Sequence, residues 1–217
     1  MKVALIGATG FVGSQVLKEL VSRGHQVTAI ARDVTKVSVQ SDLITLTSAN
    51  VLDADEVAAT VAGHDAVVSA YNPGWTNPNI YTEYLQGAAA IETGVAQSGV
   101  KRLLVVGGAG SLEVAPGVQL IDTPHFPEEY KAGAGAAREY LSILRADTTL
   151  DWTYLSPAIE MHPGTSGERK GSYRTSLDTP VYNEKGRSII SVEDLSVAIV
   201  DEIEQPKFIQ KRFTVAY

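Results

Sequence analysis

The chain has 217 residues, of which 44% are hydrophobic and 20% are charged, and its formal net charge is −7 at pH 7. A chain of this length and composition can bury one sizeable core, so an intrinsically disordered protein is excluded. The excess of acidic residues disfavours a nucleic-acid-binding protein. The absence of cysteine excludes disulfides, thiolate zinc sites, iron–sulfur clusters and thiol nucleophiles.

The beginning of the chain shows no targeting signal. Only four apolar residues, Val3 to Ile6, precede Gly7, and a secretory signal peptide needs a longer apolar region. No run of 18 apolar residues occurs, so no membrane-spanning segment is predicted. We therefore expect a cytoplasmic protein that does not bind a membrane.

Strand-length apolar runs alternate with helix-length segments along the chain. The sequence predicts strands at Lys2–Ile6, Gln26–Ala31, Leu43–Leu46, Ala66–Ala70, Arg102–Val106 and Asp151–Leu155. It predicts helices at Ser14–Arg23, Asp53–Val61, Ile80–Gln97, Glu128–Arg145 and Val192–Glu204. The strands are almost continuously apolar, which suits a sheet covered on both faces. This alternation predicts an α/β fold, namely a Rossmann-type doubly wound parallel sheet with helices on both faces.

The segment 156–191 breaks the alternation. It is rich in proline, glycine and charged residues and has no clear helix. A long irregular segment that follows the carboxyl end of a strand tends to overhang the ligand crevice of an α/β sheet. We therefore expect one domain spanning residues 1–217, with 156–191 forming a small C-terminal substrate-side lobe.

A glycine-rich motif follows the first predicted strand and precedes the first helix. It reads Gly7-Ala8-Thr9-Gly10-Phe11-Val12-Gly13, a G-x-x-G-x-x-G spacing in place of the G-x-G-x-x-G of the standard dinucleotide fingerprint. Such a turn lets backbone N–H groups approach a pyrophosphate at the positive end of the helix. The motif therefore predicts a dinucleotide-binding site, and a tight turn without a ligand is the alternative.

The end of the second predicted strand bears on which dinucleotide is bound. An Asp or Glu at this place holds the ribose 2′-hydroxyl of NAD, whereas an Arg accommodates the 2′-phosphate of NADP. Here Arg32 comes first and Asp33 follows it. The sequence therefore favours NADP(H) over NAD(H), with a solvated Arg–Asp pair as the alternative.

Taken together, these motifs resemble the extended and atypical short-chain dehydrogenase/reductase superfamily. The glycine loop is similar to the opening of that superfamily. The rest of the chain resembles its small NAD(P)H-binding, NADH-flavin reductase branch, which neighbours the biliverdin reductase B and NmrA-like groups. The matching segments are Val105–Leu112, Tyr130–Arg145, Ser156–Ala158 and Ile190–Leu195.

The resemblance implies a set of cofactor contacts. At the pyrophosphate it places Gly7, Thr9, Gly10, Phe11, Val12 and Gly13, and at the adenosine phosphate Arg32. At the adenine edge it places Asn50 and Val51, with Asn50 in the position of the usual Asp. At the ribose it places Ser69, Ala70 and Tyr71, and at the nicotinamide Gly107, Gly108 and Pro157.

The chain departs from the family at the catalytic residues. Short-chain dehydrogenases use a Tyr followed four residues later by a Lys, but here Ala134 stands four residues after Tyr130. A flavin or quinone can accept a hydride and take its proton from water, so that the protein has mainly to hold the two rings together. We therefore expect an NAD(P)H-dependent oxidoreductase that reduces a flat conjugated acceptor. Ser111, His125 and Tyr130 are the candidate catalytic residues if the protein supplies a proton.

Two other functions stay open. A non-catalytic NADP(H)-binding redox sensor of the NmrA-like kind would also lack the Tyr–Lys pair, and the longer relatives of the fold suggest a sugar-nucleotide epimerase or dehydratase. Trp75, in the loop after the fourth strand, could stack on a flat acceptor or anchor its own loop. No metal site is predicted, because no His or carboxylate pairs have ligand spacing on one element. The expected partner is a small-molecule acceptor, and both a monomer and a homodimer are compatible with the sequence.

Overall fold

One eight-stranded sheet runs through the protein, and the computed structural model describes all of residues 1–217. The strand order is β3-β2-β1-β4-β5-β8-β10-β9. Neighbouring strands are parallel except β9, which runs antiparallel to β10. The strands are β1 (Lys2–Ile6), β2 (Gln26–Ala31), β3 (Ile44–Ser48), β4 (Ala66–Ser69), β5 (Arg102–Val106), β8 (Asp151–Ser156), β9 (Arg174–Ser176) and β10 (Lys211–Ala216).

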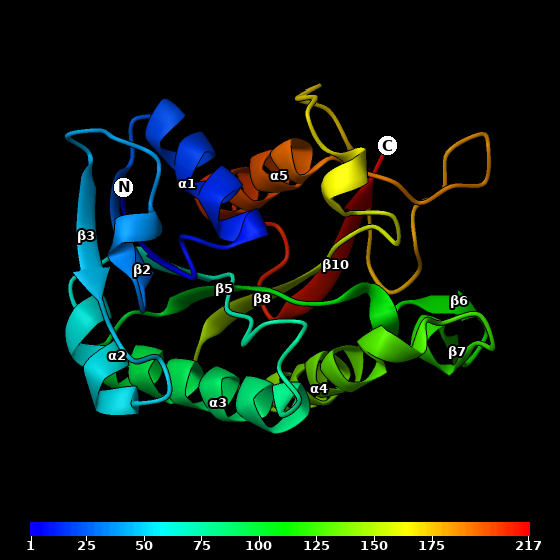
Figure 1. Ribbon diagram of the computed structural model, residues 1–217, viewed down its shortest axis with the longest axis horizontal. Coiled ribbons are helices and arrows are strands. Elements are labelled where there is room, and N and C mark those ends of the chain that lie inside the picture. Colours follow the sequence, from blue (N-terminus) through cyan, green and yellow to red (C-terminus); the bar gives the residue numbers. More distant parts are fainter.

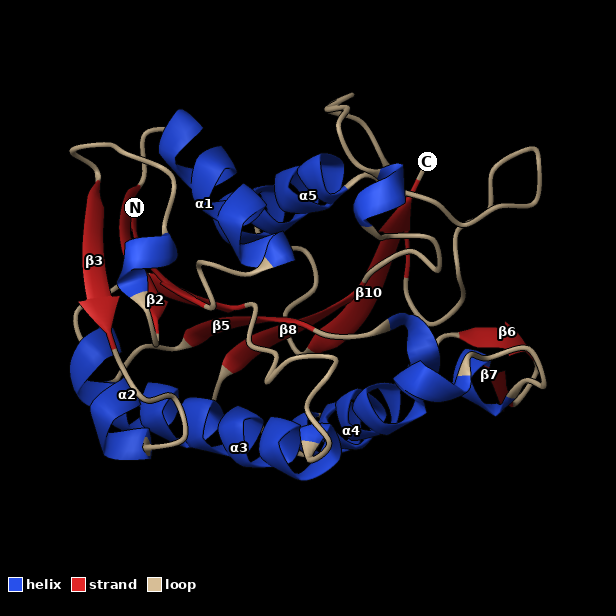
Figure 2. Ribbon diagram, viewed as in Figure 1, coloured by secondary structure: helices blue, strands red, loops and turns tan.

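The α-helices α1 to α5 cover both faces of this sheet, as Figures 1 and 2 show. They are α1 (Phe11–Ser22), α2 (Ala54–Val61), α3 (Ile80–Ser98), α4 (Glu128–Leu144) and α5 (Val192–Glu204). Helices α1 and α5 lie on one face, and α2, α3 and α4 lie on the other. The fold is therefore the predicted Rossmann-type doubly wound α/β sheet.

Alternate residues of each central strand supply the two cores. On β1, Val3 and Leu5 belong to the core under α1 and α5, while Ala4 and Ile6 belong to the core under α2, α3 and α4. Successive side chains of a strand point to opposite faces, so a strand buried on both faces needs apolar residues throughout. This requirement explains the continuous apolar runs in the sequence.

The helix starts follow local capping. The Asp53 carboxylate accepts hydrogen bonds from the backbone N–H groups of Asp55 and Glu56, and the Ser191 hydroxyl accepts one from Asp194. These side chains satisfy backbone donors that have no partner inside the helix. Helix α1 begins at Phe11, three residues before the predicted start, because Gly13 is part of the helix rather than of the loop.

Four strands were not predicted from the sequence. They are β9, β10 and the hairpin of β6 (Glu113–Ala115) and β7 (Val118–Gln119). Strand β10 lies between β8 and the edge strand β9, and its apolar pattern is broken by Arg212, a buried residue whose charge is balanced by Asp178. Lys211, Arg212 and Thr214 leave β10 without a continuous apolar run, so the sequence pattern does not mark it as a buried strand.

The segment 156–191 is irregular, as predicted, apart from two short elements. These are the 3₁₀ turn η4 (Pro163–Thr165) and strand β9. Three further 3₁₀ turns lie in other loops, at η1 (Val34–Lys36), η2 (Ala109–Ser111) and η3 (Leu120–Asp122). None of the helices is both long and apolar enough to pass through a lipid bilayer.

Candidate cofactor site

The predicted cofactor residues come from loops at one edge of the sheet. In the strand register, Ile6 is aligned with Ile30 and Ser69, and Ser69 is aligned with Val105. The loops that follow β1, β2, β4 and β5 therefore leave the sheet at the same level. The chain order reverses between β1 and β4, and ligands of open α/β sheets bind outside the carboxyl ends of the strands at this point.

The glycine loop after β1 is shaped by two close backbone approaches. Gly7 has φ +81°, and a Cβ atom on it would lie 2.6 Å from the Ala70 carbonyl oxygen. A Cβ atom on Gly13 would lie 2.1 Å from the carbonyl oxygen of Gly7. Both positions therefore exclude a side chain, which brings α1 close to the strand end as the dinucleotide-binding turn requires.

The N-terminus of α1 has no protein group to balance its positive end. It is the one helix of the five with neither a capping side chain nor an acidic residue in its first turn. Its first residues are Phe11, Val12 and Gly13, after Gly10 as the N-cap. Free N–H groups and the helix dipole favour an anion, so this loop fits the pyrophosphate of a dinucleotide.

Arg32 and Asp33, at the end of β2, differ in whether their charged groups have partners within the protein. Arg32 is exposed, and its backbone oxygen accepts from Ser48 Oγ at 3.0 Å while its guanidinium has no ion-pair partner. The Asp33 carboxylate accepts from the backbone N–H and the hydroxyl of Thr35 and lies 3.5 Å from Lys36 Nζ. The hydrogen bonds from Thr35 hold the pKa of Asp33 below its ordinary value. At the end of β2 the Arg32 guanidinium is thus free to bind an anion, whereas the Asp33 carboxylate already accepts hydrogen bonds from Thr35.

The residues predicted at the adenine and the ribose lie at the ends of β3 and β4. Asn50 is exposed, but its Oδ1 accepts from the Leu52 N–H at 3.2 Å, and Val51 is buried. Ser69 is buried at the end of β4. The Ala70 N–H donates to the Ile6 carbonyl at 3.0 Å.

Tyr71 lies against α3 rather than free in solvent. Its hydroxyl donates to the Glu83 carbonyl at 3.0 Å, and a Cβ atom on Gly87 would lie 2.3 Å from its ring. Burial is the main reason why the pKa of Tyr71 is raised. A direct ribose contact through this hydroxyl would have to replace the hydrogen bond to Glu83.

The residues predicted at the nicotinamide end two adjacent strands. Gly107 and Gly108 follow β5, and the Gly107 N–H donates to Leu155 of β8 at 2.9 Å. Pro157 follows β8 directly and is buried. The two strand ends therefore form one continuous part of the sheet edge.

Of the three candidate catalytic residues, Ser111 is the one that is buried. It is 3% exposed, and its Oγ accepts from Arg212 Nη1 at 3.2 Å. Arg212 comes from β10 and also binds the carboxylate of Asp178 in the lobe. Arg212 was not predicted as a site residue, because the strand that carries it was not predicted.

Tyr130 lies in the first turn of α4, and His125 lies in the segment before this helix. Both residues are exposed. The structure brings Tyr130 into contact with Trp75, whose ring centroid lies 5.2 Å away at an interplanar angle of 84°. Trp75 itself packs on Gly133 of α4, yet 55% of it is exposed. His125 precedes Phe126, which reaches over Gly110 of the loop after β5.

The surroundings of Ala134 leave no room for the lysine that the family pattern places four residues after Tyr130. Ala134 is buried, and a Cβ atom on Gly110 would lie 3.0 Å from the Ala134 methyl group. A lysine there would displace the loop after β5. The nearby Lys131 instead pairs with Glu128 at 2.6 Å. No group of three or more His or carboxylate residues is arranged to hold a metal ion.

The fold and the glycine loop together define a nucleotide-binding α/β protein of the oxidoreductase type. Residues 7–206 match the model of the NAD(P)H-binding family. The chain belongs to this family, an atypical branch of the short-chain dehydrogenase/reductase-like Rossmann proteins, as the motifs predicted.

Three solved structures are similar over nearly their whole length. A Burkholderia pseudomallei protein provisionally named as exported is 43% identical, with TM-score 0.87 and full coverage of both chains. A Bacteroides thetaiotaomicron protein provisionally named an epimerase is 42% identical, with TM-score 0.92, covering 100% of this chain and 96% of the other. A Streptococcus pneumoniae protein provisionally named an NADH-flavin reductase is 35% identical, with TM-score 0.87, covering 100% and 99%.

Proposed function

We propose that this protein is an NADPH-dependent reductase that transfers a hydride to a flat conjugated acceptor of the flavin or quinone type. The observation that carries the proposal is the contact between the exposed rings of Trp75 and Tyr130, in a chain whose glycine loop suits a dinucleotide but whose helix α4 lacks the Tyr–Lys pair. When bound, NADPH supplies a hydride from its nicotinamide ring. The chain's own residues bind the dinucleotide and hold the acceptor beside it.

The preference for NADPH rests on the end of β2. The free guanidinium of Arg32 can pair with a 2′-phosphate, and charge-assisted bonds from arginine to phosphate are strong. Asp33, which could otherwise accept from the 2′-hydroxyl of NAD, is occupied by Thr35. We therefore propose Arg32 as the residue that selects NADP(H).

The acceptor class rests on the aromatic pair. Trp75 comes from the loop after β4 and Tyr130 from the first turn of α4, the helix whose Ala134 contacts the loop after β5, and both rings are exposed. Aromatic rings of this kind stack on planar conjugated molecules. A flavin or quinone takes a hydride at a stabilised centre and its proton from water, so that no lysine is needed at position 134.

Two competing functions make different predictions. A sensor of the NmrA-like kind would bind NADPH without oxidising it. An epimerase, as one similar structure is provisionally named, or a dehydratase would act on a sugar nucleotide and return the cofactor unchanged. The proposed reaction belongs in the cytoplasm, where NADPH is supplied, although another similar structure is provisionally named an exported protein.

The decisive experiment is NADPH oxidation followed at 340 nm with FMN, FAD and menadione as acceptors. We expect turnover with at least one of them, and a Trp75→Ala variant should raise the KM for the acceptor while leaving the KM for NADPH unchanged. Ile143→Ala, which removes another exposed apolar side chain at the end of α4 away from Tyr130, is the matched control. Tight NADPH binding without oxidation of any acceptor would support the sensor instead.

The cofactor preference is tested by titration calorimetry of the Arg32→Ala variant. Loss of a charge-assisted contact to the 2′-phosphate should weaken NADPH binding about tenfold or more, which corresponds to about 1.4 kcal/mol. NADH binding should stay the same. Lys36→Ala removes an exposed cation nearby and serves as the control, and equal loss for both nucleotides in Arg32→Ala would contradict the proposed role.

A further inference from the structure

The loop after β5 lies where the reacting half of a bound dinucleotide would extend. Arg32 marks the adenosine side at the end of β2, and the glycine loop after β1 marks the pyrophosphate. Strands β4 and β5 follow β1 in the sheet on the side away from β2. The other half of the dinucleotide therefore extends toward Gly107 and Gly108.

A buried tyrosine supports this loop from below. Tyr154 lies on β8 and is 0% exposed. Its hydroxyl accepts a hydrogen bond from the Gly108 N–H at 3.3 Å and donates one to the Ala137 carbonyl of α4 at 2.9 Å. Burial raises the pKa of Tyr154 to about 12, so the hydroxyl keeps its proton at neutral pH and goes on donating to α4.

The ring of Tyr154 also limits how closely the loop after β5 can approach the sheet. A Cβ atom on Gly107 would lie 1.9 Å from Tyr154 Cζ and 2.1 Å from its hydroxyl oxygen. The backbone of the loop therefore rests directly on the ring. Because α4 carries Tyr130 at its start, a single side chain connects the loop after β5 with the helix that borders the aromatic pair.

We propose that Tyr154 is a positioning residue that sets the height of the loop Gly107–Gly110 against α4 and thereby the distance between nicotinamide and acceptor. This inference rests on the proposed reductase function. Tyr154 touches neither ring, and it acts through the backbone of Gly107 and Gly108. A shift of the loop by a fraction of an ångström would change hydride transfer strongly, because that step needs the reacting atoms near 3–3.5 Å apart.

A second buried tyrosine provides a matched control. Tyr140 of α4 is 2% exposed, and its hydroxyl lies near the carboxylate of Glu92 in α3 rather than against the loop after β5. Phenylalanine at this position therefore leaves the contacts of the loop after β5 intact, whereas Tyr154→Phe loses the hydrogen bonds to Gly108 and Ala137. Both variants remove one buried hydroxyl from the same side of the sheet.

The experiment compares wild type, Tyr154→Phe and Tyr140→Phe. For Tyr154→Phe we expect a kcat at least fivefold lower, an NADPH dissociation constant within twofold of wild type, and a larger isotope effect with NADPH deuterated at the transferred position. The fluorescence of bound NADPH should also change, because it reports the surroundings of the nicotinamide. Tyr140→Phe should match wild type in all four measurements.

Gly107→Ala tests the same contact from the loop side and should lower kcat in the same way, since the new methyl group meets the Tyr154 ring. Unchanged kcat and fluorescence in both Tyr154→Phe and Gly107→Ala would overturn the proposal. So would an equal loss of kcat in Tyr140→Phe. If the wild type oxidises no acceptor, the proposed function fails, but the fluorescence of bound NADPH still tests whether Tyr154 positions the nicotinamide.

Discussion

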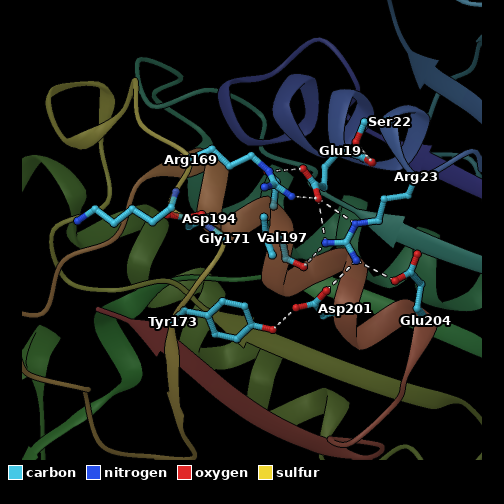
Figure 3. A network of polar contacts seen from close by, with 12 residues as sticks. Glu19, Ser22, Arg23, Arg169, Gly171, Tyr173, Asp194, Val197, Asp201 and Glu204 are labelled. Carbon is cyan, nitrogen blue, oxygen red and sulfur yellow. Dashed lines mark hydrogen bonds and ion pairs between the residues drawn. The ribbon is translucent and has the colours of Figure 1, made fainter.

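At the scale of single residues, Glu19 of α1 binds two arginines, one of them far away in the sequence. It lies on α1 with its side chain 7% exposed. Arg169, 150 residues away in the chain, donates to its carboxylate through Nε and Nη2 at 2.9 and 2.8 Å, and Arg23 donates through Nε at 2.8 Å (Figure 3). The hydrogen bond from Arg169 is the largest reason why the pKa of Glu19 is lowered.

A lowered pKa makes the contribution of Glu19 depend on pH in a defined direction. Its stabilising effect is complete above the ordinary pKa of 4.5 and is lost as the pH falls through the lower pKa of the folded state. Glu19→Gln should therefore lower the free energy of unfolding by about 2 kcal/mol at pH 7, because charged hydrogen bonds are weakened. The difference from wild type should shrink toward pH 3.

Urea unfolding at the two pH values measures this effect. Glu168→Gln is the control, since Glu168 is exposed and lies 3.9 Å from its partner Lys170. A loss for Glu19→Gln that is the same at pH 7 and pH 3 would show that packing rather than charge is responsible.

At the scale of elements, residues 167–173 form a strap that crosses α1 and α5. The Asp194 carboxylate at the start of α5 is fully buried and accepts from the N–H groups of Lys170 and Gly171 at 3.0 and 2.7 Å. At the end of the strap, the Tyr173 hydroxyl donates to Asp201 at 2.6 Å (Figure 3). An irregular segment without a helix or sheet ladder of its own is thus ordered by carboxylates of two helices.

This arrangement predicts a local effect for Asp194→Ala. The N–H groups of Lys170 and Gly171 lose their acceptor, so their hydrogen exchange should accelerate at least about tenfold as the strap opens locally. Helix α5 should keep its protection, because Ser191 still caps it. Hydrogen exchange read by NMR gives both values, and the same acceleration throughout α5 would contradict a role confined to the strap.

At the scale of the whole molecule, the sequence predicts those strands and helices whose burial produces a regular pattern of apolar residues. Six strands and five helices were found from apolar runs and helical periodicity, because each strand needs apolar residues on both faces. The glycine loop was found because its geometry demands glycine at Gly7 and Gly13. Contacts between distant residues leave no such pattern, so Tyr154 under Gly107 and the Trp75–Tyr130 pair became visible only in three dimensions.

The ion pair between Arg212 of β10 and Asp178 is another contact between distant residues, and it leads to a prediction. Arg212 of β10 has its side chain 3% exposed, and it donates to Asp178 Oδ1 through Nε at 3.0 Å and to Ser111 Oγ at 3.2 Å. The Asp178 side chain is 47% exposed and also pairs with Arg145 at 3.0 Å. One partner is therefore buried and the other can be hydrated, so their removal should have unequal costs.

Asp178→Asn leaves a buried guanidinium without a counter-charge and should cost about 3 kcal/mol of unfolding free energy, whereas Arg212→Met leaves a half-exposed carboxylate and should cost about 1 kcal/mol. In the double variant the buried charge is gone, so the loss should be close to that of Arg212→Met alone and smaller than the sum of the two. Urea unfolding of the four proteins at pH 7 measures the cycle. Equal costs for the single variants, or strictly additive losses, would mean that the charge on Asp178 is not what allows β10 to carry an arginine inside the sheet.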